Sequence, residues 1–397
     1  MLGLRTITAS EMRDINRSAI LEMIRKESPI SRTAIAEHLE VSLPTVMRIV
    51  DELLAAGLVR PHNATEWSGG RRRSLLEFNS SGHVVIGVDL GGMKMFGAIA
   101  DLGGNILQEA DIVRHTSSGE ENYRNLVRLI ELLLSSPQIE GRKIWGIGVG
   151  APAVTWHAEG IVTWAHSLKW RNFPLKEKLA EQFGLPVIVD NDVNLAALGE
   201  YWFGAGQNSQ NMVTMVVGTG IGAGIIINGS LYRGAHEASG EVCNLIPGRQ
   251  YLGKSFEDFG ALESLASSIG IANRARQLLK DRLNPRDLES LASQDVFTAA
   301  ERGEAWARDL LDETIDYLAI GIVSIIACFD PELIVLGGEI VRHAELIVDP
   351  ILQRIRGALP VQPRLVVSSL GSLAVVMGAI TNVLHNTADF YVVQKLS

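Results

Sequence analysis

The chain has 397 residues, of which 47% are hydrophobic and 20% charged, a composition typical of globular proteins with sizeable cores. At about 150 residues per domain, this length predicts two to three domains. The formal net charge of −9 excludes a protein that coats nucleic acid over its whole surface. The charge is unevenly distributed, however, because residues 1–80 carry a net charge of +1 and residues 81–397 a net charge of −10. We therefore treat these two parts as separate modules.

The cysteines and the apolar segments indicate the compartment. Cys243 and Cys328 are too few and too far apart for a disulfide framework, which favours a reducing environment. The N-terminus has no basic segment followed by an apolar core, so we expect no signal peptide. The charge-free stretch Tyr317–Phe329 is shorter than the ~20 residues that span a bilayer and predicts a buried core helix. We expect a soluble, cytoplasmic protein with no membrane partner.

Residues 1–80 show the pattern of a helix-turn-helix. Apolar residues recur on one face of a predicted helix at Asn16–Lys26. Ser31 is expected to cap a second helix, Arg32–Leu39, and Ser42 a third helix, Leu43–Ala55. Two short helices joined by a tight turn, the second with small polar residues at its start, are typical of a DNA-binding helix-turn-helix.

The third helix would present Ser42, Thr45 and Arg48 outward, as a recognition helix does. After it, Leu58–Arg60 and Ser74–Phe78 are predicted to be the two strands of a hairpin. The expected tip of this hairpin has two glycines for a tight turn and three arginines suited to phosphates or a minor groove: Gly69, Gly70, Arg71, Arg72 and Arg73. Together these features predict a winged helix that binds DNA. The alternative is a helical protein-interaction module with a solvated basic loop.

Three glycine turns follow apolar strands in residues 81–397. The strand Val84–Asp89 runs into the first turn, where an aspartate followed by glycines and a lysine suits a nucleotide phosphate, although plain Gly-Gly hairpins are also common. The second turn has four alternating glycines, which indicate a loop that meets a ligand closely. In the first turn, the predicted phosphate-binding residues are Asp89, Gly91, Gly92 and Lys94. In the second turn, which extends to Gly224, they are Gly218, Thr219, Gly220 and Gly222. In the third turn, they are Gly337 and Gly338.

Acidic side chains lie between these turns. The predicted strand Leu185–Val189 ends at Asp190-Asn191-Asp192, before a helix at Leu195–Phe203. Carboxylates at the carboxyl end of a strand face the crevice where open α/β sheets bind ligands. The alternative is that Asp192 only caps the following helix. Glu241 and Glu263 add two acidic side chains in apolar surroundings.

In this order, the motifs resemble the ROK family (repressors, open reading frames and sugar kinases) over nearly the whole chain. The resemblance implies an α/β fold: a winged helix-turn-helix at residues 1–80, followed by a two-lobed, actin-like body of the sugar kinase/RNase H-like ATPase type. We place the first lobe at 81–189, with 379–397 returning to it, and the second at 190–378. The ligand cleft would lie between the lobes, which makes three domains in all.

The resemblance also implies roles for individual residues. In family kinases the residue matching Asp192 is the general base that takes a proton from a sugar hydroxyl during transfer of the ATP γ-phosphoryl group. The positions matching Asn191, Asp192, Glu241 and Glu263 hydrogen-bond sugar hydroxyls. The Pro-Asn-Leu sugar segment of the family appears here as His166-Ser167-Leu168, and its Gly-His as Cys243-Asn244, so that Ser167 and Asn244 are further candidate sugar contacts. These replacements leave xylose, an amino sugar, a disaccharide or a polyol open as the ligand.

Two other replacements concern cofactors. The family commonly has Thr in the first phosphate loop, where this chain has Met93, a residue that lacks the hydroxyl donor and disfavours ATP. The zinc cysteines of the family would fall at Lys254, Phe256 and Ala261, and its zinc-binding histidine is also replaced. We therefore expect no metal and no cofactor, with ATP and Mg²⁺ bound only if the chain is a kinase.

The resemblance implies a sugar-responsive, DNA-binding transcriptional regulator of carbohydrate metabolism, most often a repressor in this family. Sugar in the cleft would shift the equilibrium between DNA-competent and incompetent arrangements. A homodimer on a palindromic operator, or a homotetramer, fits this function. The alternative is an ATP-dependent sugar kinase that retains a DNA-binding domain and uses Asp192 as its base. A third hypothesis is a regulator whose cleft senses no sugar and acts as a scaffold or through a protein partner.

Overall fold

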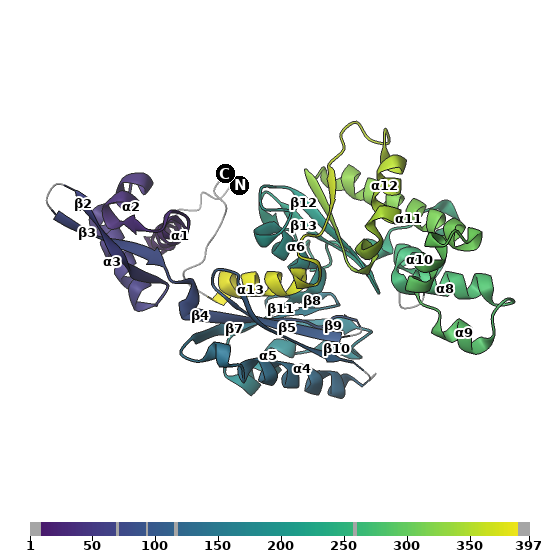
Figure 1. Cartoon of the computed structure of the whole chain (residues 1–397), viewed down its shortest axis with the longest axis horizontal. Coiled ribbons are helices and arrows are strands. Elements are labelled where there is room, and N and C mark those ends of the chain that lie inside the picture. Colours follow the sequence, from purple (N-terminus) through teal and green to yellow (C-terminus); the bar gives the residue numbers. More distant parts are fainter. Residues whose placement is uncertain (1–8, 69–70, 93, 115–117, 257–259, 388–397) are drawn as a thin grey trace, which may run out of the picture.

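The computed structural model of the chain describes residues 9–68, 71–92, 94–114, 118–256 and 260–387. Figure 1 shows a winged helical module at the N-terminal end and two α/β lobes beyond it. The predicted α/β class, with a winged helix-turn-helix ahead of a two-sheet body, is confirmed. Residue 93, where the sequence departs from the first phosphate loop of the family, lies outside the described residues.

The winged module consists of three helices and a small sheet of order β1-β3-β2. Its elements are α1 (Ala9–Glu27), β1 (Ile30–Ser31), α2 (Arg32–Leu39), α3 (Leu43–Ala55), β2 (Val59–Ser68) and β3 (Arg71–Phe78). Ser31 Oγ accepts a hydrogen bond from the backbone N–H of Ala34 at 3.2 Å, and Ser42 Oγ accepts one from Thr45 at 3.4 Å. Both predicted helix caps and the bounds of both capped helices are therefore confirmed.

The strands of the wing are longer than predicted. Pairing runs from Val59 opposite Phe78 to Ser68 opposite Arg71, with an irregularity between Pro61 and Thr65. Proline cannot donate to a strand ladder, which accounts for the break at Pro61. The prediction that all three arginines lie on the hairpin tip is therefore wrong, because 71–73 belong to β3. Gly69 and Gly70 lie outside the described residues.

The first lobe is built on a five-stranded sheet of order β11-β7-β4-β5-β6, in which β4, β7 and β11 are parallel. A separate small sheet has the order β10-β9-β8. The elements are β4 (His83–Asp89), β5 (Lys94–Asp101), β6 (Ile106–Val113), α4 (Gly119–Leu134), β7 (Lys143–Ala151), β8 (Thr155–Trp156), β9 (Ile161–Ala165), β10 (Trp170–Phe173), α5 (Leu175–Phe183) and β11 (Val187–Asn191).

The second lobe has a five-stranded sheet of order β14-β13-β12-β15-β16 and a group of helices on its far side (Figure 1). Its elements are α6 (Asp192–Phe203), β12 (Met212–Val217), β13 (Ile221–Ile227), β14 (Ser230–Leu231), α7 (Ala261–Ala266), α8 (Ser268–Leu279), α9 (Pro285–Ser290), α10 (Ser293–Glu301), α11 (Ala305–Phe329), β15 (Leu333–Gly337), α12 (Ala344–Ile355) and β16 (Arg364–Val367). The apolar stretch Tyr317–Phe329 is the second half of the core helix α11, as predicted. Among the described helices, none combines the length and apolar character needed to cross a membrane.

The last helix, α13 (Ala374–Thr387), returns to the first lobe and packs on β4, β7 and β11. Glycines make this packing possible, since a methyl group built at Gly148 would come within 2.4 Å of the Ala379 oxygen. α13 also packs closely on α6, where a methyl group at Gly378 would come within 1.7 Å of the Leu195 oxygen. The pair α6–α13 thus connects the two sheets. The division of the chain at 189/190 and 378/379 remains a prediction.

The winged module is joined to the first lobe by hydrogen bonds and by a shared core. Leu102 of the first lobe donates its backbone N–H to the Ser80 oxygen at 3.0 Å, and the neighbouring Asn79 donates its backbone N–H to the Leu58 oxygen of the winged module at 2.9 Å. Buried side chains from both parts form one apolar cluster, which includes Leu76 of the wing, Val85 of β4 and others of α13. A change in the first lobe can therefore reach the helices of the winged module through packed side chains.

Candidate functional site

Four carboxylates from separate segments converge between the lobes. Asp89 lies at the end of β4, Asp192 begins α6, Glu241 lies in the loop after β14, and Glu263 lies on α7. Each of the four residues is partly buried. The sequence predicted these four as ligand-binding residues, and the structure brings them together.

The electrostatics of the four carboxylates show that they face one another. Burial raises the pKa of Asp192 well above its ordinary value, and the charges of Asp89 and Glu241 add to the rise. Burial raises the pKa of Asp89 to about 7. Burial also raises the pKa values of Glu241 and Glu263, and the Glu241 charge adds to the rise at Glu263. Hydroxyl groups that donate hydrogen bonds would stabilise these carboxylates, which is the chemistry that a sugar supplies.

The three glycine turns meet at this site. A methyl group built at Gly92 would come within 2.8 Å of Thr219 Oγ1, so the first and second turns touch. The second turn also approaches the third, because a methyl group at Gly218 would lie 3.8 Å from the backbone nitrogen of Glu339. Glu263 Oε2 accepts a hydrogen bond from the Ile221 N–H at 2.7 Å and thereby supports the second turn. The structure thus brings the three turns together, while phosphate binding by them stays a prediction.

The second glycine turn is shorter than predicted. It comprises Gly218, Thr219 and Gly220, whereas Gly222 and Gly224 lie inside strand β13. Methyl groups there would come within 2.9 Å of the Val193 side chain and 2.4 Å of the Ala197 side chain on α6. The expectation that all four glycines belong to a ligand-binding loop is therefore wrong, because Gly222 and Gly224 let α6 approach the sheet. Gly222 stands outside the loop in which we expected a phosphate.

Asn191, rather than Asp192, is the cap of α6. Its Oδ1 accepts hydrogen bonds from the backbone N–H groups of Val193 at 2.9 Å and Asn194 at 3.0 Å, and its Nδ2 donates to the Ala153 oxygen at 3.1 Å. Asp192 is the first residue of the helix, and its Oδ1 also accepts from the Val193 N–H at 2.8 Å, so it supports the first turn without being the N-cap. Because its amide oxygen is engaged in the cap, Asn191 has mainly its amide nitrogen left for a ligand.

Arg114 holds the predicted sugar segment against the first glycine turn. Its guanidinium donates to the Gly91 and Gly92 oxygens, both at 2.8 Å, and to the Ser167 oxygen. It also donates to Asn122 Oδ1 at 3.1 Å. Sequence reasoning missed Arg114, since its partners are backbone carbonyls, which leave no pattern in the sequence. The exposed side chain of Ser167 lies beside the turn that Arg114 fixes.

A second missed residue is Arg233, which follows β14. Both of its terminal nitrogens donate to the Asp190 carboxylate, at 2.8 and 2.6 Å. Asp190 is 1% exposed and also accepts from Asn382 of α13 at 3.0 Å. This buried network joins the loop that leads to Glu241 with the strand that leads to Asp192. Asn244, the remaining predicted sugar contact, is exposed and donates to the Glu241 oxygen at 3.4 Å.

The DNA-binding candidates of α3 lie on the outer surface of the winged module. Ser42 and Thr45 lie at the start of α3 with their hydroxyl oxygens 2.8 Å apart, and the Arg48 side chain is 51% exposed. The same face presents Leu43 and Met47, 40% and 49% exposed. Apolar side chains on a recognition helix suit thymine methyl groups, a contact that the sequence analysis did not consider.

The family models and the full-length relatives agree with this geometry. A model described as "ROK family" matches residues 85–386, and one described as "Winged helix-turn-helix DNA-binding" matches residues 13–60. The chain belongs to the ROK family. A xylose repressor of Caldicellulosiruptor bescii is 30% identical over 96% of this chain and 98% of that protein. A solved ROK family transcriptional regulator, a homologue of the E. coli MLC protein, has a TM-score of 0.81 at 26% identity and covers 95% of this chain and 97% of that one.

A glucokinase of Halalkalibacterium halodurans is 34% identical over 69% of this ROK chain and 86% of that protein. The regulators therefore match nearly the whole chain, whereas the kinase matches about two thirds of it. The family resemblance inferred from the motifs is confirmed.

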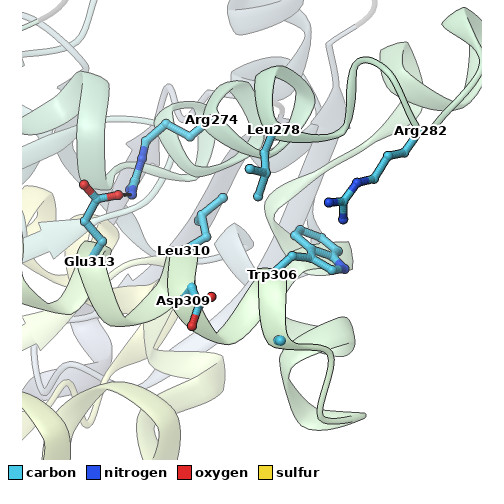
Figure 2. A pocket seen from close by; sticks show the side chains of 8 residues that line it. Arg274, Leu278, Arg282, Trp306, Asp309, Leu310 and Glu313 are labelled. Carbon is cyan, nitrogen blue, oxygen red and sulfur yellow. Dashed lines mark hydrogen bonds and ion pairs between the residues drawn. The ribbon is translucent and has the colours of Figure 1, made fainter.

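The groove of Figure 2 lies away from the four carboxylates of this ROK protein, between α8 and the first half of α11. It has a volume of about 520 Å³ and is lined by Arg274, Leu278, Arg282, Ala305, Trp306, Asp309, Leu310 and Glu313. No group of three or more His, Cys, Asp and Glu side chains within the described ranges is arranged to hold a metal ion.

Proposed function

We propose that the chain is a sugar-responsive transcriptional repressor. It would bind operator DNA through α3 and the wing, and a sugar through Asp192, Glu241 and Glu263 between the lobes. The observation that carries this proposal is the physical link between the two sites. Strand β4 ends at Asp89 in the carboxylate cluster, and its Val85 packs in the same apolar core as Leu76 of the wing. If the sugar binds two arrangements of that core with different affinity, it changes the operator affinity, and the operator changes the sugar affinity by the same factor.

The sugar is proposed from the site and from the named relative. Partly buried carboxylates with raised pKa values favour a neutral ligand rich in hydroxyl donors over an anionic one. Because a full-length relative is named a xylose repressor, D-xylose is the first candidate. An amino sugar, a disaccharide and a polyol follow. We propose that no metal or nucleotide is needed for this binding.

The operator is proposed to be palindromic and the repressor a homodimer, with a homotetramer as the larger form. A dimer of winged modules would place two recognition helices in successive major grooves, about one helical turn or a multiple of it apart.

The second candidate function is an ATP-dependent sugar kinase, favoured by the glucokinase match and by Asp192. The raised pKa of Asp192 suits a general base. Glu339 opposes this function, because it directly follows Gly337 and Gly338 and lies beside Gly218. Its carboxylate accepts a hydrogen bond from Ser268 Oγ at 3.0 Å and would repel the phosphates of ATP.

The experiment is a thermal-shift screen of pentoses, hexoses, amino sugars, disaccharides and polyols, followed by operator band shifts with the best ligand. A ligand at a hundred times its Kd should add about 2.7 kcal/mol of apparent stability. We expect the shift in wild type, its loss in Asp192→Asn and Glu241→Gln, and its retention in Arg48→Ala. A wild type that responds to none of these compounds would contradict the repressor proposal, and formation of ADP from added ATP with any of them would favour the kinase.

A further inference from the structure

The loop between Glu241 and Glu263 is fastened to helix α11 by two tyrosines. Tyr251 ends a short 3-10 turn at Arg249–Tyr251, and its hydroxyl oxygen lies 2.6 Å from that of Tyr317. Tyr317 is only 6% exposed, and the two rings meet edge to face with centroids 5.9 Å apart. Such a pair combines a hydrogen bond with an aromatic contact, and both resist movement of the loop.

The contact continues from Tyr317 to the helix that carries Glu263. The Tyr317 hydroxyl donates to Glu313 Oε1 at 2.6 Å, so the hydrogen between the two tyrosines comes from Tyr251. Glu313 forms an ion pair with Arg274 of α8, and Figure 2 shows these two side chains together at one end of the groove. Arg274 in turn donates to the Leu265 oxygen of α7 at 2.8 Å. The chain of contacts therefore begins in the loop that follows Glu241 and ends on the helix of Glu263.

The side chains of this loop do not fit the zinc ion that the family resemblance implies. The three positions expected to hold cysteines carry Lys254, Phe256 and Ala261, none of which can supply a thiolate. Two of them contact Tyr251 instead, because the Phe256 ring lies 6.1 Å from the Tyr251 ring and Lys254 Nζ lies 5.3 Å from its centroid. The nearby thiol of Cys243 donates to Glu241 Oε2 at 3.5 Å, and burial raises its pKa, so it stays protonated.

We propose that Tyr251 and Tyr317, supported by Glu313 and Arg274, form a clamp that takes the place of the metal and positions Glu241 and Glu263 for the sugar. The four are positioning residues, since they act through the loop and through α7. The effect on sugar binding rests on the proposed function, whereas the clamp itself is a property of the fold. Without the hydroxyl contact the loop gains conformational freedom, which sugar binding must then remove.

The test uses the full chain with Tyr251→Phe, Tyr317→Phe and the double variant. Amide hydrogen exchange of residues 245–256 is measured without ligand, and D-xylose affinity is measured by calorimetry. Each single variant should exchange faster in this segment and bind D-xylose about threefold to tenfold more weakly, as expected for one lost hydrogen bond. Tyr317→Phe also removes the hydrogen bond to Glu313, so the double variant should be no worse than Tyr317→Phe alone.

Tyr123→Phe is the matched control, since it removes a hydroxyl that donates to the Lys178 oxygen at 3.3 Å in the first lobe. It should leave both measurements at the wild-type value. Unchanged exchange in Tyr251→Phe overturns the clamp, whatever the sugar result. Faster exchange with unchanged D-xylose affinity overturns the positioning role. If wild type binds no sugar, the proposed function fails, while the exchange measurement still decides whether the clamp exists.

Discussion

Charged side chains in the winged module and around the cleft lie in different surroundings. On α3, the half-exposed Arg48 pairs with Glu52 at 3.5 Å, and Glu52 also pairs with Arg13 of α1 at 2.7 Å. Between the lobes, Asp190 is 1% exposed, and its carboxylate accepts hydrogen bonds from both terminal nitrogens of Arg233. Exposed pairs contribute at most about 1 kcal/mol, whereas breaking a buried pair costs about 3–5 kcal/mol. The charges of the winged module are thus available to DNA, while those around the cleft hold the binding loops in place.

The largest expected effect tests this difference directly. Arg233→Ala leaves the Asp190 charge buried without its main partner and should lower the free energy of unfolding of the body by about 3–5 kcal/mol. Arg32→Ala is the control, because Arg32 pairs with the exposed Asp51 at 3.2 Å in the winged module and should cost less than about 1 kcal/mol. Denaturant unfolding of the full chain measures both. Equal losses of unfolding free energy in the two variants would contradict the difference between the buried and the exposed ion pair.

The pH dependence of stability should come from the cleft. Burial raises the pKa of Asp89 to about 7, so the folded protein holds a proton that the unfolded chain has already released. The stability from this group is therefore present at low pH and is lost as the pH rises through about 7. Between about pH 5.5 and pH 8, wild type should lose on the order of 2–3 kcal/mol more than Asp89→Asn. The measurement is the melting temperature of both proteins across this pH range. If the two curves of melting temperature against pH run parallel, Asp89 is not the source of the pH dependence.

Arg48→Ala should weaken operator binding by about 1–3 kcal/mol and relax the sequence preference, if Arg48 reads a base edge. Arg48→Lys keeps the charge and should recover part of the affinity but not the preference. Band shifts at one fixed salt concentration, with specific and mismatched operators, separate the two effects. Arg25→Ala serves as the control, because Arg25 lies at the end of α1 and pairs with Glu22 at 2.7 Å. The assignment of α3 fails if Arg48→Ala binds as wild type does.

The smallest expected effect concerns the cap of α3. Ser42→Ala removes the oxygen that accepts from the Thr45 N–H and should destabilise the winged module by about 1 kcal/mol. Ser42→Asn retains an accepting oxygen and should stay close to wild type. Amide exchange in the first turn of α3 reports the change, with faster exchange in Ser42→Ala only. Equal exchange in the two variants would show that Ser42 does not cap the helix in solution.

Local signals explain why the winged module could be predicted closely. Ser31 and Ser42 mark the starts of α2 and α3, and apolar periodicity marks their buried faces, so both helices have the predicted bounds. The wing was predicted too short, because β2 continues through polar residues to Ser68. Whether such residues pair depends on the facing strand, and a single strand carries little information about its partner.

The sequence by itself determined the order of the modules, the helix caps, the carboxylates of the cleft and the resemblance to the ROK family, because each is written in neighbouring residues or in motif order. Only the tertiary structure decided that Arg114 and Arg233 hold the binding loops, that Gly222 and Gly224 serve packing, and that Tyr251 meets Tyr317. These contacts join residues far apart in the chain, often through backbone carbonyls that every residue possesses. The raised pKa values of the carboxylates likewise depend on the tertiary structure, because they arise from burial and, at Asp192, from the neighbouring charges of Asp89 and Glu241.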